Sequence, residues 1–578
     1  MKAFRLSVPR PALQGSAVPL LCRIGSHHLT PENLIQSIFA KLNPCHTKTM
    51  STFTLKSLLA SALAFLLAGS VHAANLTWSG GNASNSDWSS GDNWAGTPPV
   101  GTDALFFAGS TRLTNNNNLT ANTTINGITF NSGAGAFVLG GSGITLGGNV
   151  TNSSTNLQTI NLNLFSNTTR TYTMTTGGGN TTVSGNMSGT GGVTLAGTGL
   201  LTLNGTNSYS GNTTLINTTA LNINTTTAIG SGTLVTASGT IDNTSGSAII
   251  LSNNNNISLT GSLVYGGSNN LSFGSGAMTS SATRTVTTNG AGVLTIGSYN
   301  GSVAAVGLTK SGVGTLAITG AANGNVTGPI TLTQGTVLLG NKAALGSGNI
   351  QFNGGGLSAS TDLTGVNAIT NTTSLSNSSI ISGNNSIELS GNMTQTLTRT
   401  LTNNISGGNL TISGAFLGLS NSGTTNTLSL SGSGNTFISA TIQNNGTGGT
   451  ATSGNIIYNG NGSLTLSGTN TYNGSTSVSS GTLNLTGSLT ATSGVTITNA
   501  PTIFNQTSTG SIGGAANFVV TNGTGTLGGS NTYTGNTTLT AGTLNVNNAN
   551  ALGSGAGTRV ASSKNDTRAS KKQGYVDS

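Results

Sequence analysis

The sequence is poor in charged and aromatic residues, in cysteine and in histidine. Of its 578 residues only 5% are charged and 4% are aromatic, whereas a typical soluble domain has about 25% charged residues. The only two cysteines, Cys22 and Cys45, and all four histidines lie before residue 73. The rest of the chain therefore lacks the side chains for a disulfide, a Cys/His zinc site, a cysteine nucleophile or a histidine base.

Positive charge is concentrated at the two ends of the chain. Seven Lys/Arg and one acid give +6 over residues 1–73, and five Lys/Arg and two acids give +3 over residues 559–578. Between residues 75 and 558 six basic side chains balance six acidic ones. Nucleic-acid binding needs a clustered basic face that displaces counterions from phosphates. The central region has no such cluster in its sequence, so we expect no nucleic-acid partner.

Residues 50–73, MSTFTLKSLLASALAFLLAGSVHA, have the pattern of a Sec signal peptide. Lys56 supplies the positive start, an apolar run follows it, and Val71 and Ala73 are the small residues before a cleavage site at Ala74. The apolar run is shorter than the ~20 residues that a membrane-spanning helix needs. An internal buried helix is the alternative interpretation. We therefore expect a mature chain that is exported through Sec and has no transmembrane segment.

The two ends depart from the composition of the rest. We interpret residues 1–49 as a start codon assigned too early or as an extended leader, because a Sec signal peptide normally has only a few residues before its apolar run. Residues 559–578 are polar and basic, and we expect a disordered tail there. Between the ends we expect a Trp-rich cap at 74–107 and a repeat region at 108–558.

Self-similar blocks recur in the mature chain, which is the signature of a repeat architecture. The blocks are GVTLAGTGLLTLNG at 192–205 with GLTKSGVGTLAITG at 307–320; GTNSYSGNT at 205–213 with GTNTYNGST at 468–476 and GSNTYTGNT at 529–537; and GTVLLGNKAALGSG at 335–348 with GTLNVNNANALGSG at 542–555. In the second block a tyrosine lies two residues before a glycine. We assign these tyrosines and glycines as structural repeat positions: Tyr209, Tyr472, Tyr533, Gly211, Gly474 and Gly535.

Apolar residues alternate within the blocks, as at Leu201 and Leu203 or Leu316 and Ile318. A period of two predicts short strands with one buried face. Some intervals differ between copies by two residues, a change that keeps the buried face of a strand, whereas a change of one would reverse it. Strands are therefore favoured over a disordered low-complexity chain.

These features favour an all-β fold, a single long right-handed parallel β-helix, over a sandwich, because the repeats lack hairpin spacing. Equivalent side chains of a solenoid stack about 4.8 Å apart, so asparagines can form hydrogen-bonded ladders and Leu and Val a continuous core. Like charges at that spacing repel by roughly 1 kcal/mol even in water, which accounts for the scarcity of charge. Coils of about 20–25 residues give on the order of 20 coils.

All three tryptophans, Trp78, Trp88 and Trp94, lie in one short stretch together with Phe106 and Phe107. The first coil of a solenoid has an exposed edge that needs covering. We therefore expect an N-terminal aromatic cap, with a sugar-stacking platform as the alternative.

The blocks resemble the autotransporter-associated β-strand repeat, or passenger-associated transport repeat, family. The resemblance is carried by GLTKSGVGTLAITG, by GTNTYNGSTSVSSGTLNL at 468–485 and by the ALGSG ends, and it covers roughly residues 76–558. It implies a bacterial surface or secreted protein. Such proteins often carry a C-terminal outer-membrane barrel, which needs many strands of about ten residues. Here only the polar tail follows residue 558, so a barrel would have to come from elsewhere. Separately, we expect no cofactor, because the mature chain has no residue pattern that would bind one.

Few side chains of the mature chain could carry catalysis. Asp362 and Glu388 are 26 residues apart, about one coil, so they could be neighbours on one face. Paired carboxylates could serve glycoside hydrolysis, although two unrelated turn acids are the simpler interpretation.

Two further groups of charged residues have a binding interpretation and a simpler one. Asp87, Asp92 and Asp103 could ligate calcium, but Asp beside Gly or Asn is more typical of a turn. Lys310 in TKSGVG lacks the preceding glycine of a phosphate-binding loop, so we expect a solvated turn residue. We assign no catalytic, cofactor-binding or metal-binding residue.

The sequence therefore predicts a non-catalytic, exported β-helix with a structural or adhesive role on the cell surface or outside the cell. Its candidate partners are surface glycans or other cells. A polysaccharide-degrading β-helix enzyme, with Asp362 and Glu388 as its acids, is the alternative.

Overall fold

In the computed structural model the described residues belong to one unit, His72–Ser578. These residues are 73–175, 177–216, 219–420, 425–445, 453–554 and 558–561. The leader at 1–49 and, except for Ala73, the signal peptide at 50–73 lie outside the described residues, and so does the tail beyond residue 561.

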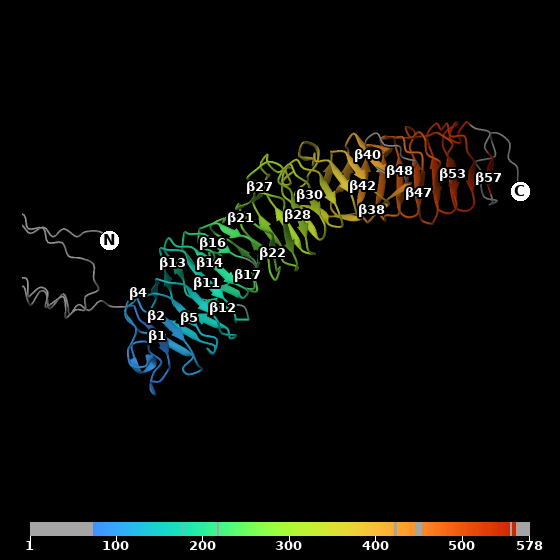
Figure 1. Cartoon of the computed structure of the whole chain (residues 1–578). Coiled ribbons are helices and arrows are strands. Elements are labelled where there is room, and N and C mark those ends of the chain that lie inside the picture. Colours follow the sequence, from blue (N-terminus) through green and yellow to red (C-terminus); the bar gives the residue numbers. More distant parts are fainter. Residues whose placement is uncertain are drawn as a thin grey trace, which may run out of the picture. The chain divides into compact units, whose positions relative to one another are not determined.

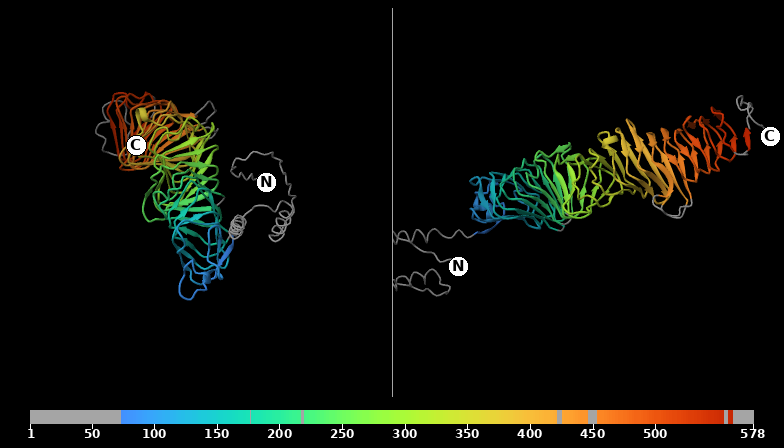
Figure 2. Two further views of the ribbon diagram at one scale, coloured as in Figure 1. Left: turned by 90° about the vertical axis from the view of Figure 1, so that its left-hand side faces the viewer. Right: turned by 90° about the horizontal axis from the view of Figure 1, so that it is seen from above.

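This unit is a parallel β-helix of about 19 turns. Its coils follow one another in chain order, from β1 (Asn75–Trp78) to β57 (Arg559–Ala561) (Figure 1, Figure 2). The described residues contain no α-helix and two short 3-10 helices, η1 (Gly91–Trp94) and η2 (Gly365–Asn367). The predicted fold and the expected number of coils are therefore confirmed.

The strands form six parallel sheets, and the chain visits up to three of them in each coil. In chain order, the sheets run from β1 to β27 (Ser298–Gly301), from β3 (Thr114–Asn117) to β43 (Thr441–Asn445), and from β4 (Thr123–Ile125) to β13 (Met187–Ser188). The other three run from β20 (Ile249–Ile250) to β57, from β36 (Ile387–Leu389) to β56 (Thr543–Val546), and from β46 (Thr469–Asn470) to β52 (Ser511–Ile512).

The order of the strands along the chain assigns these sheets to three faces. Face one carries the 11-stranded sheet that starts at β1 and then the 8-stranded sheet that starts at β36. Face two carries the 16-stranded sheet from β3 and then the 3-stranded sheet from β46, which packs against β43. Face three carries the four-stranded sheet from β4 and then the 15-stranded sheet from β20. One sheet thus succeeds another on each face while the interior continues.

The interior is built from columns of apolar side chains in register. Leu201 pairs with Leu221, and Leu221 pairs with Ile241, on successive strands of face two. All three side chains are fully buried. Side chains of alternate residues point outward, as the period of two in the sequence predicts. On the outside Asn224 donates to Asn204 and to Thr244 at 3.1 Å, a short asparagine ladder of the expected kind.

The three tryptophans form a buried cap at the first coil. Trp78 lies 5.0 Å and Trp88 5.9 Å from Trp94, measured between ring centroids, and both pairs are edge-to-face. Phe107 lies against all three rings at 5.8–6.1 Å. Phe106 does not belong to this cluster: its side chain points to the outer side of β2 (Ala104–Phe107) because neighbouring strand residues face opposite ways. The aromatic cap is confirmed, and its buried rings present no free face for stacking on a sugar.

At the other end the stack continues past the boundary expected at residue 558. Strand β57 pairs in parallel with β55 (Thr537–Leu539), with Thr538 opposite Val560. The first three residues of the expected tail therefore belong to a strand. None of the helices in the described residues has the length and hydropathy to cross a membrane.

Candidate functional sites

The tyrosines of the second repeat block are interior groups with a fixed hydrogen bond. Tyr209, Tyr472 and Tyr533 are at most 2% exposed. Each hydroxyl shares a hydrogen bond of 2.5–2.7 Å with the threonine hydroxyl four residues later. Burial raises the pKa of Tyr209 and Tyr472 well above the ordinary value of 10, so both stay protonated. The block therefore encodes a buried Tyr–Thr pair.

An asparagine two residues before each tyrosine joins three coils. Asn207 accepts a hydrogen bond from the Met187 amide of the preceding coil at 2.8 Å and donates to the Ala228 carbonyl of the next coil at 2.6 Å. Asn531 does the same with the Ile512 amide and the Ala551 carbonyl, at 2.8 and 2.6 Å. We did not single out these asparagines in the sequence, although the recurring Asn-x-Tyr-x-Gly pattern contains them.

The glycines of the same block allow neighbouring coils to approach closely. A Cβ atom would lie 2.4 Å from the Gly192 nitrogen at Gly211 and 2.3 Å from the Gly454 oxygen at Gly474. At Gly535 it would lie 2.3 Å from the Ala516 oxygen. Any side chain at these positions would push two coils apart.

Asp362 and Glu388 lie on adjacent coils. Asp362 accepts a hydrogen bond from the coil of Glu388, and Glu388 accepts hydrogen bonds from the coil of Asp362 and from the coil that follows its own. Asp362 accepts from the Ser386 amide at 2.7 Å. Glu388 accepts from the Gly365 amide at 2.7 Å and from the Ser413 hydroxyl at 2.5 Å. These contacts give both acids a role in holding irregular loops to the stack.

The aspartates of the cap are likewise hydrogen-bond acceptors. Buried Asp103 accepts from the amides of Ala74 and Val100, both at 2.8 Å. Asp87 accepts from the Asn116 side chain at 2.8 Å, and Asp92 from the Asn82 side chain at 3.4 Å. Within the described ranges no three His, Cys, Asp or Glu side chains come together as a metal site.

The prediction for Lys310 was wrong: the side chain is fully buried in β28 (Leu308–Ser311). Its ammonium group donates to the carbonyls of Ser311 and Gly312 at 2.8 Å and of Gln334 at 3.1 Å. Charged side chains are almost never buried without a partner, and here the partners are backbone carbonyls that the sequence does not reveal. Burial lowers the pKa of Lys310 to about 8.

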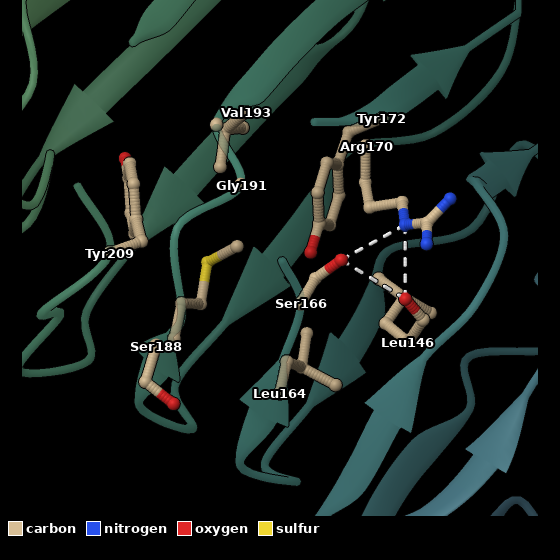
Figure 3. Close-up of a pocket in the computed structure, with 11 residues that line it drawn as sticks. Leu146, Leu164, Ser166, Arg170, Tyr172, Ser188, Gly191, Val193 and Tyr209 are labelled. Atoms are coloured by element: carbon tan, nitrogen blue, oxygen red, sulfur yellow. Dashed lines mark hydrogen bonds between the residues drawn. The ribbon is translucent and has the colours of Figure 1, made fainter. Parts of the chain in front are cut away.

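A cavity of about 20 Å³ lies at the corner where face three loses its first sheet after β13 (Figure 3). Its apolar wall includes Leu164 and Met187, and its polar lining includes Ser166, Arg170 and Tyr172. Nε of Arg170 donates to the Leu146 carbonyl at 2.9 Å and to Ser166 Oγ at 3.0 Å. The Tyr172 hydroxyl has no hydrogen-bond partner among the described residues. We did not predict this site from the sequence.

The three-residue sequence Thr-Arg-Thr is a signal that could have pointed to this corner. It recurs around Arg170, Arg284 and Arg399, at the start of β11 (Arg170–Met174), β25 (Arg284–Thr288) and β38 (Arg399–Ile405). Nε of Arg399 donates to a carbonyl of the preceding coil, Ser376 at 2.8 Å, as Arg170 does to Leu146. At Arg170 and Arg399 the arginine therefore holds the preceding coil, whereas Nε of Arg284 has no hydrogen-bond partner among the described residues.

Comparison with known proteins supplies one family. Residues 193–219, 308–339, 456–485 and 522–546 match the passenger-associated transport repeat. Neither the curated proteins nor the solved structures contain a significant match to this chain.

The matched segments begin on different faces of the β-helix. The first begins on face one, at β14 (Val193–Gly197), and the second on face two, at β28. The third begins on face three, at β44 (Gly454–Tyr458). Each matched segment thus spans three or more successive strands, and the repeat can start on any face. The chain carries passenger-associated transport repeats in four places along a parallel β-helix, which is the architecture of an autotransporter passenger at the cell surface.

Proposed function

We propose that the protein is a non-catalytic passenger, exported through Sec, that acts as a structural or adhesive element on surface glycans or other cells. The repeats support the passenger assignment, and the polar, nearly uncharged exterior supports contact with carbohydrate. Sugars present hydroxyl groups, which neutral hydroxyl and amide side chains can bind without the cost of desolvating a charge.

The observation that carries the proposal is a row of outward side chains on face two. The row runs through consecutive coils and consists of Thr285, Thr309, Thr331, Gln351, Ser374 and Thr394. All six are half-buried, and their coils are spaced about 4.8 Å apart. A straight row of neutral polar groups at a fixed spacing matches a polymer that repeats along its own axis.

Replacing Thr309, Thr331 and Thr394 with valine tests this surface. Valine keeps the shape and strand preference of threonine but removes the hydroxyl. We expect the triple variant to lose at least half of its retention on a polysaccharide array or on cells, with an unchanged circular dichroism spectrum. Valine at Thr171, Thr194 and Thr214, outward threonines in register on face one, is the matched control. Equal retention of both variants and wild type would refute the proposed face.

The export step has a separate test. Expression of the full chain in a Gram-negative host, followed by N-terminal sequencing of the exported protein, should give Ala74 as the first residue. A chain that stays in the cytoplasm with residues 50–73 intact would contradict export through Sec.

The alternative is a polysaccharide-degrading enzyme that uses Asp362 and Glu388. The two acids lie on adjacent coils, and this proximity is the observation that favours the alternative. The purified chain should be incubated with neutral and acidic polysaccharides while reducing ends are measured. Release of reducing ends that Asp362→Ala or Glu388→Ala abolishes would overturn the non-catalytic assignment.

A further inference from the structure

The corner cavity combines one free hydrogen-bond donor with an apolar wall. Tyr172 is 1% exposed, and its hydroxyl has no partner among the described residues. In Figure 3 this hydroxyl points toward Ser166 and Leu164. A buried donor without a partner costs about 1–3 kcal/mol, so an acceptor that enters the cavity would recover that free energy.

Three of the other polar groups of the lining, Ser166 Oγ, Arg170 Nε and the Tyr209 hydroxyl, already have partners. Ser166 Oγ lies 3.1 Å from the Leu146 carbonyl and 2.9 Å from the Thr168 carbonyl, donates its one hydrogen to one of them and accepts from Arg170 Nε. The hydroxyl of Tyr209, which also lines the cavity, is bonded to Thr213. The Tyr172 hydroxyl is therefore the fully buried donor that is left for a ligand.

The charge of the corner selects the sign of the ligand. Arg170 lines the cavity, and the lining contains no Asp or Glu to balance it. Burial raises the pKa of Tyr172 far above 10, so its hydroxyl keeps its proton and cannot act as the counter-charge. An anion that accepts from Tyr172 would therefore also lie in the field of the guanidinium group.

The size of the cavity limits the ligand further. A volume of about 20 Å³ holds one or two groups the size of water. It has room for the two oxygens of a carboxylate but not for a sugar ring. Leu164, Met187 and Val193 would meet a methyl or methylene group attached to the carboxylate.

We propose that the corner cavity binds the carboxylate of a small organic acid or of an acidic sugar, with Tyr172 as the hydrogen-bond donor and Arg170 as the cation. This site does not depend on the adhesive role, since face two and the corner share no residue. Its failure and the failure of the proposed function are therefore measured separately.

The test uses methyl NMR of the full chain labelled with ¹³C at the methionine methyl groups. Met187 lines the cavity, while Met174, Met278 and Met393 are buried residues outside its lining and act as internal controls. Titration with acetate at constant chloride should shift the Met187 signal, assigned through Met187→Leu, and leave the three controls in place. A shift that equals the one caused by added chloride would overturn the proposal.

Two comparisons separate the hydrogen bond from the charge. Tyr172→Phe keeps the ring and should weaken acetate binding at least about tenfold, because hydrogen bonds to a charged group are strong. Tyr209→Phe, whose hydroxyl is bonded elsewhere, should bind acetate as the wild type does. Acetamide has the shape of acetate without its charge and should bind several-fold more weakly. Equal loss in both tyrosine variants, or equal binding of acetate and acetamide, would overturn the site.

The source of the carboxylate follows from a third titration. Galacturonate and glucuronate carry the same group on a sugar ring that must stay outside the cavity. Binding of either with the same Met187 shift would identify acidic glycans as the source, and a shift with acetate alone would identify small organic acids.

Discussion

The repeat copies at 193–203 and 308–318 place different residues at the same interior position. Leu195 in β14 and Lys310 in β28 each lie four residues before a glycine, and both are fully buried. The leucine completes an apolar column with Leu215. The lysine lays its stem along the same kind of column and ends at three carbonyls. This repeat position, which is occupied by Leu195 or Lys310, can therefore hold a buried cation when carbonyls of the turn and of the next coil surround the cation.

A third copy extends the comparison to an aromatic residue. Tyr458 ends β44, again four residues before a glycine, and is 2% exposed. Its hydroxyl has no partner among the described residues. Leucine, lysine and tyrosine thus occupy one repeat position, but only the lysine gains new hydrogen bonds there.

The largest effect is expected from Lys310→Ala. The variant leaves a cavity and removes the donor of three buried carbonyls, so we expect it to cost about 3–5 kcal/mol. A solenoid can open locally, so the measurement is amide hydrogen exchange of peptides that contain β28 and β29 (Thr315–Ile318).

Two variants serve as references for Lys310→Ala. Leu195→Ala removes apolar contacts alone and should cost about 2–5 kcal/mol. Lys310→Met keeps the volume of the stem but not the donor, and should fall between Lys310→Ala and wild type. Exchange rates around β28 that match wild type in both Lys310 variants would show that the ammonium contacts contribute nothing.

The second effect is a dependence of stability on pH. Burial lowers the pKa of Lys310 from 10.5 to about 8, so between these values the unfolded chain binds more protons than the folded chain. The free energy of unfolding should therefore rise as pH increases from about 8, by at most about 3 kcal/mol in total. Urea unfolding at pH 7.5, 8.5 and 9.5 would measure the rise. Lys310→Met should abolish it.

Buried tyrosines set the upper limit of that window. Burial raises the pKa of Tyr458 from 10 to about 12. The stability that it contributes is complete below pH 10 and is lost as pH rises toward 12. A decrease of stability between pH 7.5 and 8.5 in wild type would contradict the account of Lys310, because the tyrosines stay protonated there in both the folded and the unfolded chain.

The sequence predicted the coil and its interior but not the relation between coils. The alternation at Leu201 and Leu203 identified a buried strand face, and the clustered tryptophans identified the cap. Coil length could not be read in the same way: Leu201 and its partner Leu221 are 20 residues apart, whereas Leu401 and Leu430 are 29 apart. Loops outside the core vary in length at little cost in free energy. The face on which each repeat begins therefore depends on loops that carry no pattern.

The site residues were predictable only where the chemistry is local. The Tyr-x-Gly pattern lies within a nine-residue block that recurs along the chain, so Tyr209 and Gly211 could be recognised as repeat positions. The burial of Lys310 depends on the Gln334 carbonyl in the next coil, and the cavity depends on the end of a sheet at β13. Contacts between coils could be recognised only where a motif recurs, as at Asn207 in Asn-x-Tyr-x-Gly, and neither Lys310 nor the cavity has such a motif around all of its partners.

The smallest expected effect on stability comes from removing the hydroxyl group of a buried tyrosine. Tyr472→Phe breaks the bond to Thr476 and leaves a buried threonine hydroxyl unpaired, so we expect it to cost about 1–2 kcal/mol. Tyr458→Phe removes a hydroxyl that has no partner among the described residues and should be neutral or slightly stabilising. Hydrogen exchange across β44 and β47 (Ser475–Val478) measures both. The double variant Tyr472→Phe/Thr476→Val removes both partners together and should recover much of the loss, because no unpaired group remains. A loss of equal size in Tyr458→Phe would mean that both hydroxyls are bonded, and the contrast between a repeat position with a built-in partner and one without would then fail.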